Sequence, residues 1–374
     1  MHIKTLILLI TIPVALCRTA GAQNISLLFA GDAMQHQAQI DNARRNGGSY
    51  NYTDNFRYIK DEISSADLSV VNLEAPLGGA PYSGYPAFCA PDEFAYALKE
   101  CGFDIFLTAN NHCLDRGSKG IRRTVDTLDS LKVHHTGTYR NPAIRERNYP
   151  LIMKKGEFRI AFLNYTYGSN GIVAKSDCVI DYIDTTLIKK DIEDAKRRNA
   201  DIIIAAVHWG EEYNLLPSVN QKKLSSWLHN AGVRVVIGSH PHVIQPIEVE
   251  AGDGGEIENI TVYSLGNFIS NMRTKMTMGA IIFRMELSKE GEKITINSPR
   301  YSKIFTQRPA IVPSSPFCII TADSATIKDY KLPQKLRLDV KAFSDGADEI
   351  FSNHNKGKVC EYFWSKKSDG SCTE

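Results

Sequence analysis

The sequence has no surplus of charge and no internal repeat. Its 374 residues hold 44 Lys and Arg against 42 Asp and Glu. The first 22 residues contain Lys4 and Arg18 and no acidic residue, so the remainder carries 42 charges of each sign. A chain without a basic surplus is a poor candidate for general nucleic-acid binding or polybasic attachment to a membrane, and we expect no nucleic-acid partner. With 43% hydrophobic and 23% charged residues, the composition is that of a globular protein.

The sequence also lacks an apolar run long enough to cross a bilayer. The run at 6–16 has eleven residues, whereas a membrane helix needs roughly 20. A basic start, this run and the small residues Ala20-Gly21-Ala22 form the pattern of a cleaved secretory signal. We therefore predict a signal peptide over 1–22 and an exported protein, periplasmic or at the cell surface. Cys17 leaves lipid modification open as an alternative, although Leu16 precedes it where a small residue is usual.

Seven cysteines remain after the predicted cleavage, and because seven is odd, at least one stays unpaired. Cys360 and Cys372 flank a short polar tail, where a disulfide is plausible in an oxidising compartment. The alternative is that all seven are thiols in a large domain that needs no disulfides. We favour buried thiols for the five cysteines before Cys360.

Short apolar runs rich in β-branched residues alternate with stretches of helical period, which is typical of an α/β fold with a sheet buried on both faces. The turn-rich segment 252–255, between apolar runs at 246–249 and 260–263, predicts a late antiparallel hairpin. The pattern weakens after Pro299, so we predict one domain over 23–299 and a C-terminal extension over 300–374. The other predicted strands are 25–30, 68–73, 105–108, 160–163, 202–207 and 233–238, and the predicted helices include 186–198 and 221–230.

Polar side chains follow five of the predicted strands, at the point where each strand ends. Because ligands bind at the carboxyl ends of the strands in an open α/β sheet, we expect these side chains to converge. Imidazole nitrogens, carboxylate oxygens and an amide oxygen suit divalent transition metals, and six such ligands are enough for two ions that share a carboxylate. The seven converging side chains are these six candidate ligands, Asp32, Glu74, Asn111, His208, His240 and His242, together with His112.

The pair His240 and His242 is the strongest single indication of a metal. Alternate residues of an extended segment share a face, and Pro241 disfavours a helix at His240. By contrast, a lone Asp after a strand is more often a helix cap or turn former, and a lone His is more often a hydrogen-bonded polar residue than a ligand.

Six ordered motifs together resemble the bacterial poly-γ-glutamate capsule synthesis family, CapA or PgsA, a branch of the calcineurin-like metallophosphoesterases. The resemblance runs from about Ile25 to Asn271. The motifs are Gly31-Asp32-Ala33-Met34, Asn72-Leu73-Glu74, Ala109-Asn110-Asn111-His112-Cys113-Leu114-Asp115-Arg116-Gly117, His208-Trp209-Gly210-Glu211-Glu212-Tyr213, Gly238-Ser239-His240-Pro241-His242-Val243-Ile244-Gln245 and Tyr263-Ser264-Leu265-Gly266-Asn267-Phe268.

The resemblance implies a four-layer α-β-β-α sandwich and a site of one or two divalent ions, of Mn, Zn, Fe or Mg. Asp32 and His242 would hold the first ion, and Glu74 would bridge the two. The second ion would be held by Asn111, His208 and His240. His112 would be the catalytic proton donor to the leaving group.

Two positions depart from the phosphoesterase pattern. Met34 stands where the pattern has a histidine, and a thioether is a poor ligand for a hard divalent ion, which weakens the first site. His36 would replace it only if its loop turned inward, which we do not expect. Glu74 stands where the pattern has aspartate. Around the site, we interpret Asp115 and Arg116 as a salt bridge that braces the loop of His112.

The resemblance implies an exported metal-dependent hydrolase or transferase that acts on a phosphoester or on an anionic polymer such as poly-γ-glutamate. Its partners would include membrane components of a capsule synthase. Two alternatives stay open: a non-catalytic accessory that binds the polymer with a degenerate metal site, and a generic metallophosphoesterase. Trp209, Glu211 and Tyr213 would form a wall of the site, and Asn267 would reach the substrate.

Overall fold

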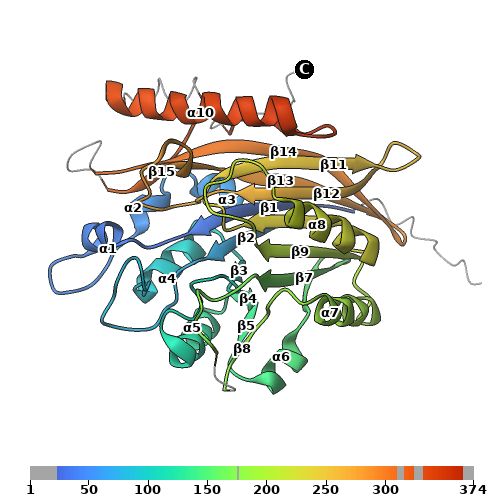
Figure 1. Ribbon diagram of the computed structural model, residues 1–374, viewed down its shortest axis with the longest axis horizontal. Coiled ribbons are helices and arrows are strands. Elements are labelled where there is room, and N and C mark those ends of the chain that lie inside the picture. Colours follow the sequence, from blue (N-terminus) through green and yellow to red (C-terminus); the bar gives the residue numbers. More distant parts are fainter. Residues whose placement is uncertain (1–22, 175–176, 310–315, 324–331, 365–374) are drawn as a thin grey trace, which may run out of the picture.

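The computed structural model describes residues 23–174, 177–309, 316–323 and 332–364. The predicted signal peptide, Cys17 and Cys372 lie outside the described residues. Within that part of the chain, the mixed α/β prediction is confirmed, with a large central sheet and helices on its faces (Figure 1).

One hydrogen-bonded path joins most strands, in the order β4-β3-β2-β1-β13-β14-β12-β10-β9-β7-β6. β1 to β4 pair in parallel, and so do β7, β9, β10 and β12. The long strand β14 pairs with β13 and contacts β12, so it links these two parallel groups. The strands are β1 (Gln23–Ala33), β2 (Leu68–Leu73), β3 (Ile105–Leu107), β4 (His134–Thr136), β5 (Thr138–Tyr139), β6 (Leu151–Lys155), β7 (Phe158–Thr166), β8 (Val179–Ile180), β9 (Ile202–His208), β10 (Val235–Ser239), β11 (Ile244–Ala251), β12 (Ile257–Leu265), β13 (Gly279–Glu290), β14 (Lys293–Gln307), β15 (Cys318–Thr321) and β16 (Cys360–Glu361).

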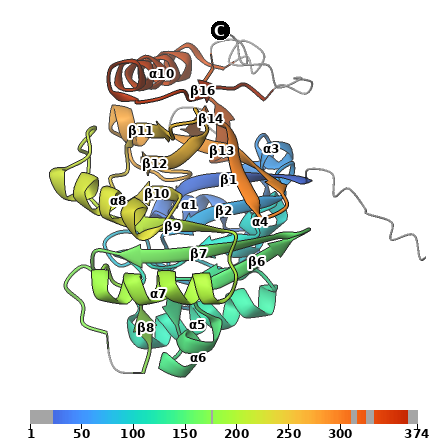
Figure 2. The ribbon, with the colours of Figure 1, turned by 90° about the vertical axis from the view of Figure 1, so that its right-hand side faces the viewer.

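The two parallel groups pack face to face, and helices cover their outer faces. The main core contains Phe29 and Val70 from one group and Phe162 and Ile204 from the other. A second core lies between the first group and helices α2 to α4, and a third lies between the second group and helices α7 and α8 (Figures 1 and 2). The layers therefore run helix, sheet, sheet, helix, but β14 joins the two sheets into one.

Both predicted helices and all six predicted strands lie close to their predicted positions. The predicted helices 186–198 and 221–230 correspond to α7 and α8, and the six predicted strands correspond to β1, β2, β3, β7, β9 and β10. The helices are α1 (Gln37–Ala43), α2 (Thr53–Phe56), α3 (Lys60–Ser64), α4 (Asp92–Cys101), α5 (Gly117–Leu131), α6 (Pro142–Asn148), α7 (Thr185–Arg197), α8 (Val219–Ala231) and α10 (Gln334–His354), with the 3₁₀ turn η1 (Lys275–Thr277).

The late hairpin is confirmed: β11 and β12 pair antiparallel around the turn at 252–255. The domain boundary that we placed after Pro299 falls inside β14, which runs on to Gln307. Further along, α10 buries Leu336, Val340 and Phe343 against the main core. The C-terminal segment therefore packs directly on the strands that link the two groups.

Four of the cysteines before Cys360 are buried thiols, namely Cys89, Cys101, Cys113 and Cys318, and Cys178 is buried as well. Burial raises the pKa of the Cys101 and Cys113 thiols to about 12, so both stay protonated at neutral pH. No helix in the described part of the chain combines the length and the hydropathy that a bilayer-spanning helix needs.

Candidate metal centre

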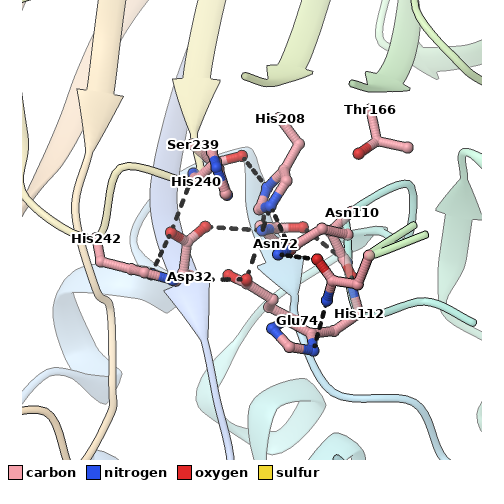
Figure 3. A network of polar contacts seen from close by, with 12 residues as sticks. Asp32, Asn72, Glu74, Asn110, His112, Thr166, His208, Ser239, His240 and His242 are labelled. Carbon is pink, nitrogen blue, oxygen red and sulfur yellow. Dashed lines mark hydrogen bonds and ion pairs between the residues drawn. The ribbon is translucent and has the colours of Figure 1, made fainter. Parts of the chain in front are cut away.

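The predicted site residues converge at the carboxyl ends of the central strands (Figure 3). Asp32 lies near the end of β1, Glu74 follows β2, and His208 ends β9. Asn111 and His112 follow β3, while His240 and His242 lie between β10 and β11. All seven side chains are at most 4% exposed, so the residues form a buried polar cluster. Convergence was the central expectation from the sequence, and it is correct.

The backbone of β1 aims Asp32 into this cluster. The pairing of β1 with β2 shifts register between Ala30 and Asp32, and such a bulge redirects a side chain. Gly31 allows the strand to approach its neighbour, because a Cβ there would lie 1.9 Å from the carbonyl oxygen of Gly266. The Asp32 carboxylate accepts hydrogen bonds from Asn72 Nδ2 at 2.7 Å and from the backbone N–H of His240 at 3.2 Å. Its Oδ2 also lies 3.5 Å from His242 Nδ1.

Glu74 is the least compensated group of the cluster. It is fully buried, and neither carboxylate oxygen has a hydrogen-bond partner among the described residues. Its Oε1 lies 3.6 Å from His208 Nε2 and 3.9 Å from His242 Nε2. Burial, and then the negative charges of Asp32 and Glu212, raise the pKa of Glu74 well above its usual value. A buried carboxylate in this position calls for a cation.

His208 and Asn111 face each other on the other side of Glu74. His208 Nε2 lies 2.9 Å from Asn111 Oδ1, and Ser239 Oγ lies 3.0 Å from His208 Nδ1. The hydroxyl of Ser239 therefore fixes the ring so that Nε2 points into the cluster, an arrangement common around metal-bound histidines. Burial, and then the neighbouring imidazoles, keep the pKa of His208 well below its usual value, so the ring is neutral and able to bind a metal.

The local conformation of His240 and His242 differs from the prediction. Instead of an extended segment, the chain turns after β10, and both residues have positive φ, of 98° and 59°. Such a backbone is strained for residues other than glycine and is typical of functional sites. The turn still brings the two rings together, with centroids 6.0 Å apart. Asn267 Oδ1 lies 2.9 Å from His242 Nδ1, which leaves Nε2 facing Glu74.

His112 forms a pair with Asp115 at the edge of the cluster. Asp115 Oδ2 lies 2.8 Å from His112 Nδ1 and also accepts the backbone N–H of Phe88 at 2.7 Å. The Phe88 ring packs edge-on against His112, with centroids 4.6 Å apart. The interpretation of an Asp115–Arg116 salt bridge is wrong: Asp115 braces His112 directly, while Arg116 donates to Pro81 and Ser83.

Met34 is buried in the hydrophobic core on the outer face of β1 and β2, where it packs as an apolar side chain. His36 caps α1 instead, and its Nδ1 accepts the backbone N–H of Asn271 at 3.3 Å. The expectation that His36 does not replace the missing ligand agrees with this position.

We expect Met34→Leu to cost less than about 1.5 kcal/mol of stability, because the two side chains have similar volume in a packed core. Since position 34 holds no ion, the variant should bind divalent ions with wild-type affinity. Chemical denaturation and calorimetric titration with Mn²⁺ check the two statements. A clear loss of metal affinity would show that the thioether contributes to the site.

Sequence reasoning missed several residues around the cluster. Tyr167 follows β7 and packs on His240, with ring centroids 4.6 Å apart, and Asn170 Nδ2 lies 3.4 Å from His112 Nδ1. The exposed Glu212 lies beside His240 and His242. Tyr167 carried the same signal as the predicted residues, a polar side chain just beyond a strand end, and could have been found from it.

The residues predicted to form a wall of the site or to contact substrate differ in their exposure and in their hydrogen-bond partners. Trp209 is buried and donates from Nε1 to Tyr263 O at 2.9 Å, whereas Glu211 is exposed and accepts from Asn214 at 2.6 Å. Tyr213 is half exposed, and its ring centroid lies 6.3 Å from that of His242. Asn267 is buried and its Oδ1 orients the ring of His242, while its contact with substrate stays a prediction.

The donor set fits divalent metal ions. Asp32, Glu74 and His242 offer ligand atoms that all lie within 4.8 Å of one another. The oxygens of Glu74 and the Nδ1 of His240 are buried without hydrogen bonds in the described structure, as expected of atoms that bind an ion. Which metal is bound does not follow from this donor set, because oxygen and imidazole ligands suit several divalent ions.

Comparison with known proteins agrees with this reading of the motifs. The family described as bacterial capsule synthesis protein PGA_cap matches residues 26–272, more than half of the chain. The chain belongs to this family. The family match covers every residue of the cluster.

Two curated relatives come from Bacillus. The PGA biosynthesis protein CapA of Bacillus subtilis is 30% identical over 284 residues, which cover 73% of this chain and 70% of that protein. The capsule biosynthesis protein CapA of Bacillus anthracis is 26% identical over 283 residues, which cover 73% of this chain and 66% of that one. The match thus spans slightly less than two thirds of the B. anthracis protein. Among solved structures, the NAD nucleotidase of Haemophilus influenzae aligns with a TM-score of 0.47 at 11% identity, over 88% of this chain and 61% of that one.

Proposed function

We propose that this protein is a metal-dependent hydrolase or transferase that acts on an anionic polymer, such as poly-γ-glutamate, or on a phosphoester during capsule synthesis. The observation that carries the proposal is Glu74, a buried carboxylate that has no hydrogen-bond partner among the described residues. Potential metal ligands surround it, and the His112–Asp115 pair flanks it. The names of the two Bacillus relatives, which refer to capsule and PGA biosynthesis, support a capsule polymer as the substrate.

Six side chains would hold the ions. When bound, two divalent ions supply positive charge that lowers the pKa of a shared water and offsets negative charge on the reacting group. Asp32, Glu74 and His242 would hold the first ion, and Glu74, Asn111, His208 and His240 would hold the second. Ser239 and Asn267 orient two of the imidazoles through their hydrogen bonds.

His112 would handle the proton of the leaving group. Its Nδ1 faces the Asp115 carboxylate, which can only accept a hydrogen bond, so Nε2 is the nitrogen that remains to give a proton to the departing atom. Phe88 packs against the ring and limits its rotation. Asp115 holds the orientation of the ring through this contact.

A groove of about 580 Å³ beside the cluster would hold the rest of the substrate. Its lining includes Tyr167, which packs on His240, and Leu224 and Trp227 from α8. Lys223 lies in the same groove and offers a positive charge to an acidic polymer, and Glu211 adds one negative charge to the lining. Aromatic and apolar walls with one basic group suit a chain that has both methylene segments and carboxylates.

A non-catalytic accessory that binds the polymer is the second candidate. The burial of Met34 among apolar side chains favours it, because the first ion then has fewer ligands than the phosphoesterase pattern provides. We also propose that the protein is exported, on the basis of the signal pattern in residues 1–22, and that it acts alongside membrane components of a capsule synthase.

Metal analysis together with turnover tests the proposal. We expect the purified protein to retain or bind one or two divalent ions, and to hydrolyse an aryl phosphoester or shorten poly-γ-glutamate. His240→Ala should lower both metal content and turnover. A protein without any bound ion, or with turnover unaffected by His240→Ala, would contradict the proposal. Polymer binding without turnover would favour the accessory, and turnover of phosphoesters alone would favour a generic phosphoesterase.

A further inference from the structure

Glu212 lies on the solvent side of the cluster, in the loop between β9 and α8. It is exposed, in contrast to the seven buried residues of the cluster. One carboxylate oxygen of Glu212 and one ring nitrogen each of His240 and His242 lie within 4.8 Å of one another. His242 also belongs to the group of Asp32 and Glu74, so the two groups adjoin each other through a shared imidazole.

Backbone contacts hold Glu212 in place above the histidines. The N–H of Tyr213 donates to Pro241 O at 2.8 Å, and the N–H of Trp209 donates to Ser239 O at 3.1 Å. Gly210 has a φ of 89°, and a Cβ there would lie 2.6 Å from Gln221 Oε1, so the loop turns tightly against α8. The loop that carries Glu212 is therefore bonded, on both sides of this residue, to the turn that carries the histidines.

Two further features of the cluster indicate that a ligand is needed on this side. His240 is only 3% exposed, and its buried Nδ1 has no hydrogen-bond partner in the described structure. Position 34, where the phosphoesterase pattern has a ligand, is occupied by a methionine packed in the core. Without it, the first ion has three protein ligands, Asp32, Glu74 and His242, one fewer than a closed four-coordinate site.

We infer that Glu212 is a metal ligand that binds the ion held by His242 from the solvent side and compensates for the ligand missing at position 34. The inference rests on the proposed function, since it assumes that the cluster binds metal. A carboxylate is a suitable ligand for each of the divalent ions considered. Because Glu212 is the exposed member of the ligand set, it lies where the substrate has to approach the ions.

Titration of the metal-free full-length protein with Mn²⁺ tests the inference, with calorimetry as the measure of affinity and electron paramagnetic resonance as the measure of free Mn²⁺. Glu212→Gln removes the charge and keeps the size. Glu211→Gln is the matched control, because the neighbouring Glu211 is also exposed but its carboxylate accepts from Asn214.

We expect Glu212→Gln to raise the dissociation constant of the lower-affinity Mn²⁺ site at least tenfold. Even residues that only orient ligands change metal affinity by about 10–100-fold. Glu211→Gln should bind Mn²⁺ like the wild type. Thermal unfolding of both metal-free variants should match the wild type, because both side chains are exposed.

Wild-type Mn²⁺ affinity in Glu212→Gln, or an equal loss in Glu211→Gln, would overturn the inference and leave the proposed function standing. The opposite pattern, a selective loss of affinity in Glu212→Gln together with no turnover of any substrate by the wild type, would support the inference and contradict the proposed function. A wild-type protein that binds no Mn²⁺ would overturn both.

Discussion

Replacing Glu74 by glutamine is expected to stabilise the metal-free protein and to abolish its stabilisation by metal. In the metal-free state, Glu74 is a buried carboxylate with no hydrogen-bond partner in the part of the chain that the structure describes, and it lies close to the negative charge of Asp32. The glutamine amide stays buried as well, but a neutral amide is less costly to bury than a charge, so the free energy of unfolding should rise by about 1–3 kcal/mol. With metal at one hundred times its dissociation constant, the wild type gains about 2.7 kcal/mol, a gain that the variant should lose.

The stabilisation of the metal-free protein should depend on pH in a defined direction. The pKa of Glu74 is raised by burial in the folded state, so the folded protein keeps a proton that the unfolded chain releases. The stability that protonated Glu74 gives the folded protein is therefore fully present below the pKa of Glu in the unfolded chain, about 4.3. It is lost as pH rises through the pKa of Glu74 in the folded protein. The stability difference between Glu74→Gln and the wild type should accordingly be small near pH 4 and should grow as pH rises.

Urea denaturation of both proteins, with chelator and with Mn²⁺, measures these differences. Asp181→Asn is a suitable control, because Asp181 is also fully buried but pairs with Arg145, its Oδ1 lying 2.5 Å from Nε. This control should be less stable than the wild type, equally with and without metal. If Glu74→Gln proved less stable than the wild type in chelator, or still gained stability from Mn²⁺, Glu74 would not be the central ligand.

The convergence of the site was predictable because it depends on a regularity of α/β sheets. Each strand that carries a site residue could be recognised from its apolar run, and parallel strands present their carboxyl ends at one edge. This regularity is sufficient to bring Asp32 on β1 and His208 on β9 together, although 176 positions separate them in the sequence. It does not depend on the conformation of any loop.

What could not be predicted depends on loop conformation and on long-range pairing. His240 and His242 were expected in an extended segment, yet both have positive φ, because their turn is bonded to Asp32 and to the loop of Tyr213. The proximity of Glu212 to the histidines follows from the same backbone contacts, which leave no periodic signal in the sequence. Likewise, the pairing of β14 with both β13 and β12 joins the two sheets, and an apolar run alone does not reveal its partners.

His112→Ala is expected to slow turnover in a way that depends on the leaving group. If His112 gives a proton to the departing atom, its loss matters most when that atom is a poor leaving group such as an alkoxide or an amine. Proton transfer of this kind contributes about 10²–10⁴-fold to the rate, so kcat on an alkyl phosphoester or an amide should fall by that factor. A nitrophenyl ester, whose leaving group departs without a proton, should be affected far less.

Metal binding distinguishes this role from a structural one. His112 lies at the edge of the cluster with its Nδ1 beside Asp115 and is not one of the six proposed ligands, so His112→Ala should titrate with Mn²⁺ like the wild type. Asp115→Asn, which removes the charge beside Nδ1, should show the same dependence on the leaving group with a smaller loss. His134→Ala is the control, since this exposed histidine on β4 lies outside the cluster and should leave kcat unchanged.

The pattern across substrates decides between the two interpretations of the His112–Asp115 pair. If His112→Ala slowed nitrophenyl and alkyl esters equally, the ring would position substrate or ions and would not transfer a proton. An equal loss accompanied by weaker Mn²⁺ binding would place His112 among the groups that support the metal ligands. Neither positioning of substrate nor support of the metal ligands depends on the basicity of the departing atom. A loss of kcat confined to poor leaving groups, with Mn²⁺ affinity intact, is therefore the result that a proton donor held by Asp115 produces and the other two roles do not.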